Sequence, residues 1–324
     1  MTDTINWGVL GAAKFAREQM APAIHAARGA RLYGLATSAP EKAAPFRAYC
    51  PDLKVYAGYD ELLADPEIHA VYIPLPNHLH RTWTLKALDA GKHVLCEKPL
   101  CMKAAEFDDI IARRDATGLL AAEAFMIVHH PQWLLAQEKV QDGTIGRLTH
   151  VDATFSYDNS GDPGNIRNTP DTGGGSLPDI GVYTIGSARF VTGQEPVAAN
   201  WADITWENGV DVTARAALRF PGFGLVTTTS MRLAPRQEVI FHGDKGVLRL
   251  TAPFNPRVFG EARVVLEQGR ERQEWRFPGD SHYVAQVESF GAAIRGDGAF
   301  PCPLEFSRGT QAAMDMIFEQ ARAG

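Results

Sequence analysis

Short apolar runs that alternate with helical segments constrain the fold of this chain more than any other feature. Within the first 125 residues, runs of strand length lie at 5–10, 31–36, 55–56, 70–73, 93–97 and 119–124. Helical candidates lie between them, such as 77–90, which Gly91 ends, and 103–117, which Gly118 ends. Strands that alternate with helices build parallel sheets from βαβ units. This part therefore predicts a doubly wound α/β domain of the dinucleotide-binding kind.

The pattern changes after Phe125. Strand-like runs at 151–157, 213–220, 224–231, 238–242, 247–250 and 262–266 are joined by short turns, which suits an antiparallel sheet. Two helices are expected at 282–295 and 304–322. The sequence thus predicts two domains, 1–125 and 126–324, with a final helix that could pack back on the first.

Length and charge exclude several classes of protein. At about 150 residues per domain, 324 residues suit two domains. Lys and Arg number 32 against 38 Asp and Glu, and a net charge of −6 argues against a nucleic-acid partner. The four cysteines show no metal-ligand spacing, so we expect reduced thiols, no metal and a cytoplasmic location. Residues 1–7 lack a signal-peptide pattern, and no apolar stretch is long enough to span a membrane.

A glycine turn follows the first strand-like run. Gly11, Ala13 and Ala16 form G-x-A-x-x-A, a variant of the dinucleotide-binding fingerprint. Gly11 would allow the tight turn, and the small Ala13 would let a pyrophosphate approach the backbone at a helix N-terminus. A turn of this kind needs no ligand, so the motif alone leaves both interpretations open.

The end of the second run bears on the choice of cofactor. NAD sites usually place an acidic residue here to bind the ribose hydroxyl, whereas this chain has Thr37 and Ser38, with Lys42 nearby. The pattern favours NADP over NAD, although an exposed helix N-cap would look the same.

Two further strand ends carry candidate residues. Pro74, Pro76 and Asn77 follow the fourth run and form a rigid edge, or a proline-rich turn in which Asn77 caps a helix. Lys98 follows the fifth run, between Glu97 and Pro99, where its ammonium group could hold a substrate hydroxyl and stabilise an oxyanion. A solvated surface lysine is the alternative.

The second half supplies a long polar loop, 159–175, that ends in three glycines. Pro178 suits the first turn of a following helix, which would place Asp179 and Tyr183 four residues apart on one face. A tyrosine near a lysine could exchange a proton near neutral pH. Without that context, both are ordinary residues of a helix.

These motifs occur in order: GVLGAAKFA, YIPLPNHLH, CEKP, EAFMIVHHPQ and GGGSLPDIGVY. The sequence resembles the family of glucose-fructose oxidoreductase and inositol dehydrogenase over nearly its whole length. It is most similar to the branch of dimeric dihydrodiol dehydrogenase and NADP-dependent D-xylose dehydrogenases. The resemblance implies a Rossmann domain, a C-terminal α/β domain with a large open, mostly antiparallel sheet, and a homodimer or homotetramer formed through that sheet.

The resemblance also implies roles for single residues. Lys98 matches the catalytic lysine, Tyr183 the residue that transfers the proton, and Asp179 an acidic residue of the substrate site. Substrate binding is expected at Lys98, His129, Arg167, Asp179 and Tyr183. Cofactor binding is expected at Gly11, Ala13, Lys14, Phe15, Thr37, Ser38, Lys42, Pro74, Pro76, Asn77, His80, Glu97, Lys98 and Glu123. The Lys98–Pro99 peptide bond is expected to be cis.

Two departures from the family pattern affect these expectations. Relatives often carry Ser-Arg where this chain has Thr37-Ser38, which leaves both NADP and NAD open. Ile127 and Val128 stand where an aromatic residue and an arginine are usual. The expected activity is hydride transfer between a nicotinamide cofactor and a sugar, polyol or diol, and the alternative is a regulatory protein that senses the nucleotide.

Overall fold

The computed structural model describes residues 4–323, which divide into two compact units. The first unit runs to Cys101 and adds Ala105–Met126 and Ser281–Ser307; the second holds Met102–Ala104, Ile127–Asp280 and the chain from Arg308 onward. The units therefore interleave along the chain, whereas the sequence predicts one division after Phe125. Residues 1–3, which belong to the segment 1–7 that lacks a signal-peptide pattern, lie outside the described residues.

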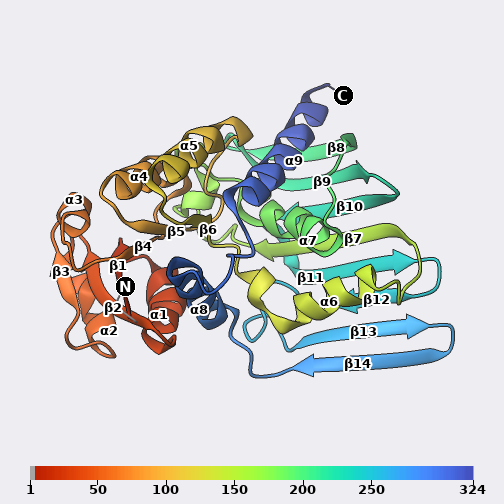
Figure 1. The fold of residues 1–324 in the computed structure, drawn as a ribbon. Coiled ribbons are helices and arrows are strands. Elements are labelled where there is room, and N and C mark those ends of the chain that lie inside the picture. Colours follow the sequence, from red (N-terminus) through yellow and green to blue (C-terminus); the bar gives the residue numbers. More distant parts are fainter. Residues whose placement is uncertain (1–3, 324) are drawn as a thin grey trace. The chain divides into compact units, whose positions relative to one another are not determined.

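A six-stranded sheet forms the centre of the first unit (Figure 1). All five strand pairs are parallel, in the order β3-β2-β1-β4-β5-β6. This confirms the doubly wound sheet, with its topological switch point between β1 and β4. The strands are β1 (Ile5–Leu10), β2 (Ala30–Ala36), β3 (Lys54–Tyr56), β4 (Ala70–Ile73), β5 (His93–Cys96) and β6 (Ala121–Glu123).

Helices connect these strands, and two of their ends bear on the predictions. Gly118 takes a left-handed conformation (φ 65°) and ends α5 as expected. Pro76 occupies the N-cap of α4, so Asn77 is the first helical residue and the expectation that it caps the helix is wrong. The helical segments are η1 (Ala16–Met20), α1 (Ala21–Ala26), η2 (Pro40–Ala43), α2 (Ala44–Arg47), α3 (Tyr59–Leu63), α4 (Asn77–Asp89), η3 (Ala104–Glu106), α5 (Phe107–Thr117) and α8 (His282–Arg295).

The second unit is built on an eight-stranded sheet in the order β14-β13-β12-β11-β7-β10-β9-β8. The β7–β10 pair is parallel and the other described pairs are antiparallel, which confirms the mostly antiparallel sheet. Its strands are β7 (Leu148–Asp158), β8 (Ala198–Glu207), β9 (Val210–Phe220), β10 (Phe223–Ser230), β11 (Arg232–Gly243), β12 (Val247–Leu250), β13 (Ala262–Gln268) and β14 (Glu271–Phe277).

Helices α6 and α7 lie against one face of this sheet (Figure 1). None of the helices within residues 4–323 is long and apolar enough to cross a membrane. The remaining segments are η4 (Met126–His129), α6 (Pro131–Gln141), η5 (Ile166–Asn168), η6 (Pro170–Thr172), η7 (Leu177–Gly181), α7 (Val182–Thr192) and α9 (Leu304–Ala323).

Candidate functional site

The carboxyl ends of the parallel strands bring together most of the predicted cofactor residues. Gly11 follows β1, Thr37 follows β2, Pro74 follows β4 and Glu97 follows β5, while Glu123 is the last residue of β6. In a parallel sheet these ends share one edge, and ligands of doubly wound sheets bind there, at the switch point. The first unit therefore presents its candidate residues along a single edge.

The turn after β1 has the conformation that a dinucleotide site requires. Gly11 has φ +106°, and a Cβ there would lie 3.1 Å from Leu75 Cδ2. Ala13, Lys14 and Phe15 follow it at the start of a helical stretch that continues through η1 and α1. A backbone cradle that a side chain would fill, followed by a helix N-terminus, fits a pyrophosphate group.

The end of β2 carries no acidic side chain at its first two positions. Thr37 is buried, its amide donates to the Tyr56 carbonyl, and its Oγ1 accepts a hydrogen bond from the Ala39 amide at 3.2 Å. It is therefore not an exposed N-cap. Ser38 and Lys42 are exposed and available to a ligand at this end of the sheet.

His80 forms hydrogen bonds to the two segments that follow β4 and β5. Its Nδ1 lies 2.8 Å from the Pro99 carbonyl and its Nε2 lies 2.6 Å from the Leu75 carbonyl. Burial lowers the pKa of His80 to about 4, although both carbonyls favour its protonated form. The imidazole is fully buried, so it can shape the edge through Leu75 and Pro99.

Lys98 stands among buried acidic and phenolic groups. The Tyr72 hydroxyl donates to Glu97 Oε1 at 2.6 Å, and the Lys98 amide donates to Glu97 Oε2 at 3.3 Å. Glu123 Oε1 accepts from the Leu100 amide at 2.8 Å, and burial raises the pKa of this carboxyl. The Lys98–Pro99 bond is cis, as expected. The backbone on both sides of Lys98 is thus held by two carboxylates.

In the second unit, three glycines bring the polar loop onto the start of a helix. The Gly175 amide donates to the Arg167 carbonyl at 3.0 Å. A Cβ on Gly174 would lie 2.4 Å from that same carbonyl oxygen, closer than real contacts allow. The glycines therefore permit the backbone approach that places Arg167 beside the helical segment η7.

This approach creates an ion pair at the predicted substrate residues. Arg167 Nε lies 2.8 Å from Asp179 Oδ2, and the Tyr157 hydroxyl donates to the same oxygen at 2.7 Å. The Asp179 side chain is 10% exposed, whereas that of Arg167 is 40% exposed. The carboxylate is therefore nearly buried, whereas the Arg167 side chain as a whole is half-buried.

The side chain of Asp211, in β9, binds the start of the helical segment η7. Its Oδ2 accepts hydrogen bonds from Ser176 Oγ at 2.9 Å and from the Leu177 amide at 2.6 Å. Gly175 has φ +128°, and a Cβ there would overlap Asp211 Oδ1. Burial raises the pKa of Asp211 to about 6. An acceptor at a helix N-terminus satisfies amides that lack a partner within the helix.

Tyr183 lies in the first turn of α7 and is buried beside the rings of Phe155 and Phe254. Residues 177–181 form a π-helix rather than the expected α-helix. A π-turn bonds residues five apart, so Asp179 and Tyr183 remain on neighbouring positions of one side.

His129 ends η4 in the second unit, after the buried Ile127 and Val128. Burial lowers the pKa of His129 to about 3. Its imidazole is therefore neutral at physiological pH, and its Nε2 atom is buried, so a ligand would reach this nitrogen only if the surrounding side chains moved.

Several residues of the site were missed from the sequence: Tyr72, Tyr157, Asp211 and Tyr283. Tyr283, in α8, contacts the Phe15 ring edge-on at a centroid distance of 5.6 Å, beside the glycine turn. Tyr157 ends a predicted strand directly before the polar loop, a position that could have singled it out. Asp211 and Tyr283 are brought to the site by tertiary packing and carried no local signal.

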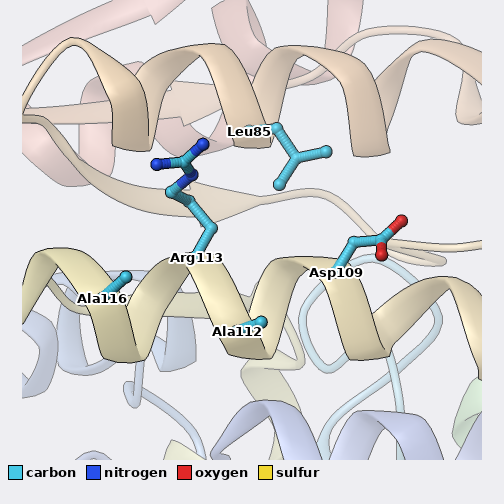
Figure 2. Close-up of a pocket in the computed structure, with 5 residues that line it drawn as sticks. All are labelled: Leu85, Asp109, Ala112, Arg113 and Ala116. Carbon is cyan, nitrogen blue, oxygen red and sulfur yellow. The ribbon is translucent and has the colours of Figure 1, made fainter.

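A pocket elsewhere on the first unit contains none of the candidate catalytic or cofactor-binding residues. Figure 2 shows it between α4 and α5, lined by Leu85, Asp109, Ala112, Arg113 and Ala116. Asp109 pairs with Arg81, and Arg113 pairs with Asp89 at 2.9 Å, which are ordinary surface ion pairs. Within the described residues, no group of three or more His, Cys, Asp or Glu could hold a metal ion.

Comparison with known proteins assigns both parts of the chain to one family of oxidoreductases. Residues 5–125 match the model of the GFO/IDH/MocA oxidoreductase family, described as an NAD-binding Rossmann fold. Residues 133–249 match the model of the GFO/IDH/MocA C-terminal domain.

Relatives cover nearly the whole chain. An uncharacterized oxidoreductase, ORF334, of Rhizobium meliloti is 38% identical over 99% of this chain and 98% of its own length. A D-xylose 1-dehydrogenase (NADP(+)) of Haloferax volcanii is 32% identical, covering 98% of each protein. The crystal structure of KijD10, a 3-ketoreductase from Actinomadura kijaniata in complex with NADP and TDP-benzene, superimposes with a TM-score of 0.89 at 30% identity, covering 98% of both chains.

Proposed function

Because the chain belongs to the GFO/IDH/MocA family of NAD(P)-dependent oxidoreductases, we propose that it transfers a hydride reversibly between a nicotinamide cofactor and a sugar. The reacting centre is a carbinol carbon in one direction and a carbonyl carbon in the other. When bound, the nicotinamide ring accepts the hydride during oxidation and donates it during reduction.

Lys98 and Tyr183 carry the proton chemistry in this proposal. During oxidation, the Lys98 ammonium donates a hydrogen bond to the reacting hydroxyl oxygen. For this step Tyr183 must be deprotonated: its phenolate takes the hydroxyl proton directly, or Lys98 gives a proton to the phenolate and takes the hydroxyl proton in its place. The electrons of the broken O–H bond would then form the C=O bond as the hydride left the carbon for the bound nicotinamide. Asp179 orients Tyr183 or a neighbouring substrate hydroxyl.

The Arg167–Asp179 ion pair is the observation that carries the substrate class. The two charges compensate each other, and the half-buried Arg167 side chain carries guanidinium N–H donors in addition to the Nε that pairs with Asp179. Such a pair suits the hydroxyls of an uncharged polyol better than a strongly anionic group.

NADP is the favoured cofactor. The exposed Ser38 and Lys42 at the end of β2 provide neutral and basic groups for a 2′-phosphate. The names of the H. volcanii dehydrogenase and of the KijD10 complex both include NADP, which supports this preference.

The test is a screen of aldoses, polyols and dihydrodiols with NADP and with NAD, following the absorbance of the reduced nicotinamide. Lys98→Ala and Tyr183→Phe should each lower turnover on the best substrate by about 10²-fold or more, the scale of a positioned acid or base. Lys245→Ala, which removes an exposed lysine of a turn in the second unit, is the matched control.

Wild-type turnover in both site variants would refute the mechanism. Tight cofactor binding without turnover on any substrate would instead favour a nucleotide-sensing regulatory protein.

We further propose that the chain forms a homodimer or homotetramer through its large sheet. Register places Trp201 beside Ala217, Ala217 beside Val226, and Val226 beside Asp152, so they form one row across four strands. Trp201 is 49% exposed and Val226 is 39% exposed. Large apolar side chains gathered on one sheet face suit contact with a second copy.

A cytoplasmic location is part of the same proposal. All four cysteines are buried and form no disulfide, as expected of thiols kept reduced. Fractionation of the source cells, with recovery in an extracellular or periplasmic fraction as the contrary result, tests it.

A further inference from the structure

We propose that Tyr157 is a positioning residue of this enzyme: with Arg167 it fixes the Asp179 carboxylate in the orientation that turnover requires, without itself touching the reacting atoms. The proposal rests on the proposed function for the role of Asp179. The geometry that carries it lies entirely within the second unit.

Three separate elements meet at one oxygen atom. Tyr157 comes from the end of β7, Arg167 from η5 in the polar loop and Asp179 from η7. The Tyr157 hydroxyl and Arg167 Nε both approach Asp179 Oδ2, at 2.7 Å and 2.8 Å. Two donors on one oxygen restrict rotation of the carboxylate about its Cβ–Cγ bond, because either rotation breaks a charge-assisted hydrogen bond.

The Tyr157 ring is itself held in place. It packs against Val210, Val212 and Met231, which are 3%, 1% and 0% exposed, and contacts the Phe155 ring at a centroid distance of 6.3 Å. This packing restricts rotation of the Tyr157 side chain and so keeps its hydroxyl next to Asp179. Phenylalanine would keep this packing and remove the hydroxyl alone.

Tyr157 acts as a hydrogen-bond donor and not as a proton carrier. Burial and the neighbouring Asp179 raise the pKa of Tyr157 well above its usual range, although Arg167 and Arg232 oppose the shift. The phenol therefore keeps its proton throughout the working pH range. The charged and titratable groups around the cluster are Tyr157 from β7, Arg167 from the loop, Tyr183 from α7 and Arg232 from β11.

Tyr157→Phe tests the proposal. We expect kcat to fall about tenfold, the usual effect of losing a hydrogen bond to a charged group, with the KM for the cofactor unchanged. We also expect the acidic limb of the pH–rate profile to move to higher pH, because the charged carboxylate loses a donor that favours it. A purely structural role would not move this limb.

The control is Tyr49→Phe. Tyr49 also has a buried hydroxyl, but that oxygen has no hydrogen-bond partner among the described residues, so its removal should leave kcat and the pH profile unchanged.

A ¹³C NMR titration of aspartate-labelled protein gives a second measurement that needs no substrate. The Asp179 carboxyl signal is identified by its loss in Asp179→Asn, and Tyr157→Phe should raise its titration midpoint. An unchanged midpoint together with an unchanged pH profile would overturn the proposal. Wild-type protein without turnover would contradict the proposed function instead, and the NMR titration would still decide whether Tyr157 holds Asp179.

Discussion

Two buried carboxylates, Asp179 and Asp211, hold the polar loop and the start of η7 in the second unit. Asp179 is held by a phenol and a guanidinium, whereas Asp211 is held by a hydroxyl and a backbone amide at the start of the same helical segment. Asp179 pairs with the half-buried Arg167, and Asp211 lies against Gly175. A site carboxylate and its support are thus built from the same residue type with different partners.

Asp211 gives a prediction about stability and pH. Because burial raises the pKa of Asp211 from 3.8 to about 6, the folded state binds this proton more tightly than the unfolded state does. The resulting stabilisation is complete below the unfolded value and is lost as pH rises through about 6. Asp211→Asn cannot titrate, so the free energy of unfolding of wild type relative to this variant should fall between about pH 4 and pH 7, by at most about 3 kcal/mol.

Urea unfolding of both proteins at the two pH values measures this difference. Asp171→Asn, at an exposed aspartate of the same loop region, should show no such trend. A constant difference between wild type and Asp211→Asn would contradict the burial argument.

At the scale of elements, the polar loop is held in place by hydrogen bonds to a neighbouring strand. Arg232 at the start of β11 donates from Nη1 to Asn159 Oδ1 at 2.6 Å and from Nη2 to Asn168 Oδ1 at 3.2 Å. Its Nε lies 2.8 Å from Glu207. One arginine therefore ties both ends of the segment that carries Arg167.

Gly174→Ala tests whether the glycines set this loop. The new methyl group would lie 2.4 Å from the Arg167 carbonyl oxygen and 2.7 Å from that of Thr169, so backbone must move. We expect a loss of stability of about 1–3 kcal/mol and a fall in kcat, because Arg167 leaves Asp179. Gly164→Ala, in the same loop with open space around its Cβ, is the matched control in urea unfolding and in turnover. Equal behaviour of the two variants would show that Gly174 has no special role.

Sequence patterns predicted the strands that have one or both faces buried, but they did not predict β8 and β14. β8 and β14 form the two edges of the large sheet, and most of their residues are exposed or half-buried, as in Glu271-Arg272-Gln273-Glu274. Edge strands of this kind lack apolar alternation. The contacts of Tyr157 with Asp179 and of Asp211 with Ser176 join a strand to the helical segment η7 or its N-cap, and such packing between distant elements is encoded by no local pattern.

Across the whole molecule, function is divided between two compact units. The cofactor edge belongs to the first, and the Asp179 cluster with the open sheet belongs to the second. The motifs that predicted the activity are local in the sequence, whereas the row of residues proposed as an assembly surface follows only from the register of the strands.

Assembly is tested at this scale by Val226→Glu. A carboxylate in the middle of the exposed row should weaken association at least tenfold, because a charge would be buried without a partner. Light scattering coupled to size exclusion should then show smaller particles than wild type. Val258→Glu, at a valine that is 77% exposed in the turn after β12, should leave the assembly unchanged. Identical masses for Val226→Glu and wild type would exclude this face.

The close approach of Gly174 and Gly175 to the Arg167 carbonyl has a consequence for engineering substrate range. Backbone contacts join the loop to Gly174 and Gly175, and the Asp211 side chain binds the start of η7, so we expect these parts to tolerate exchange together better than singly. A graft from a relative should keep its fold when it spans residues 157–183 together with position 211. A graft of the loop alone should unfold at lower urea concentration, a difference that unfolding curves of the two chimaeras would reveal.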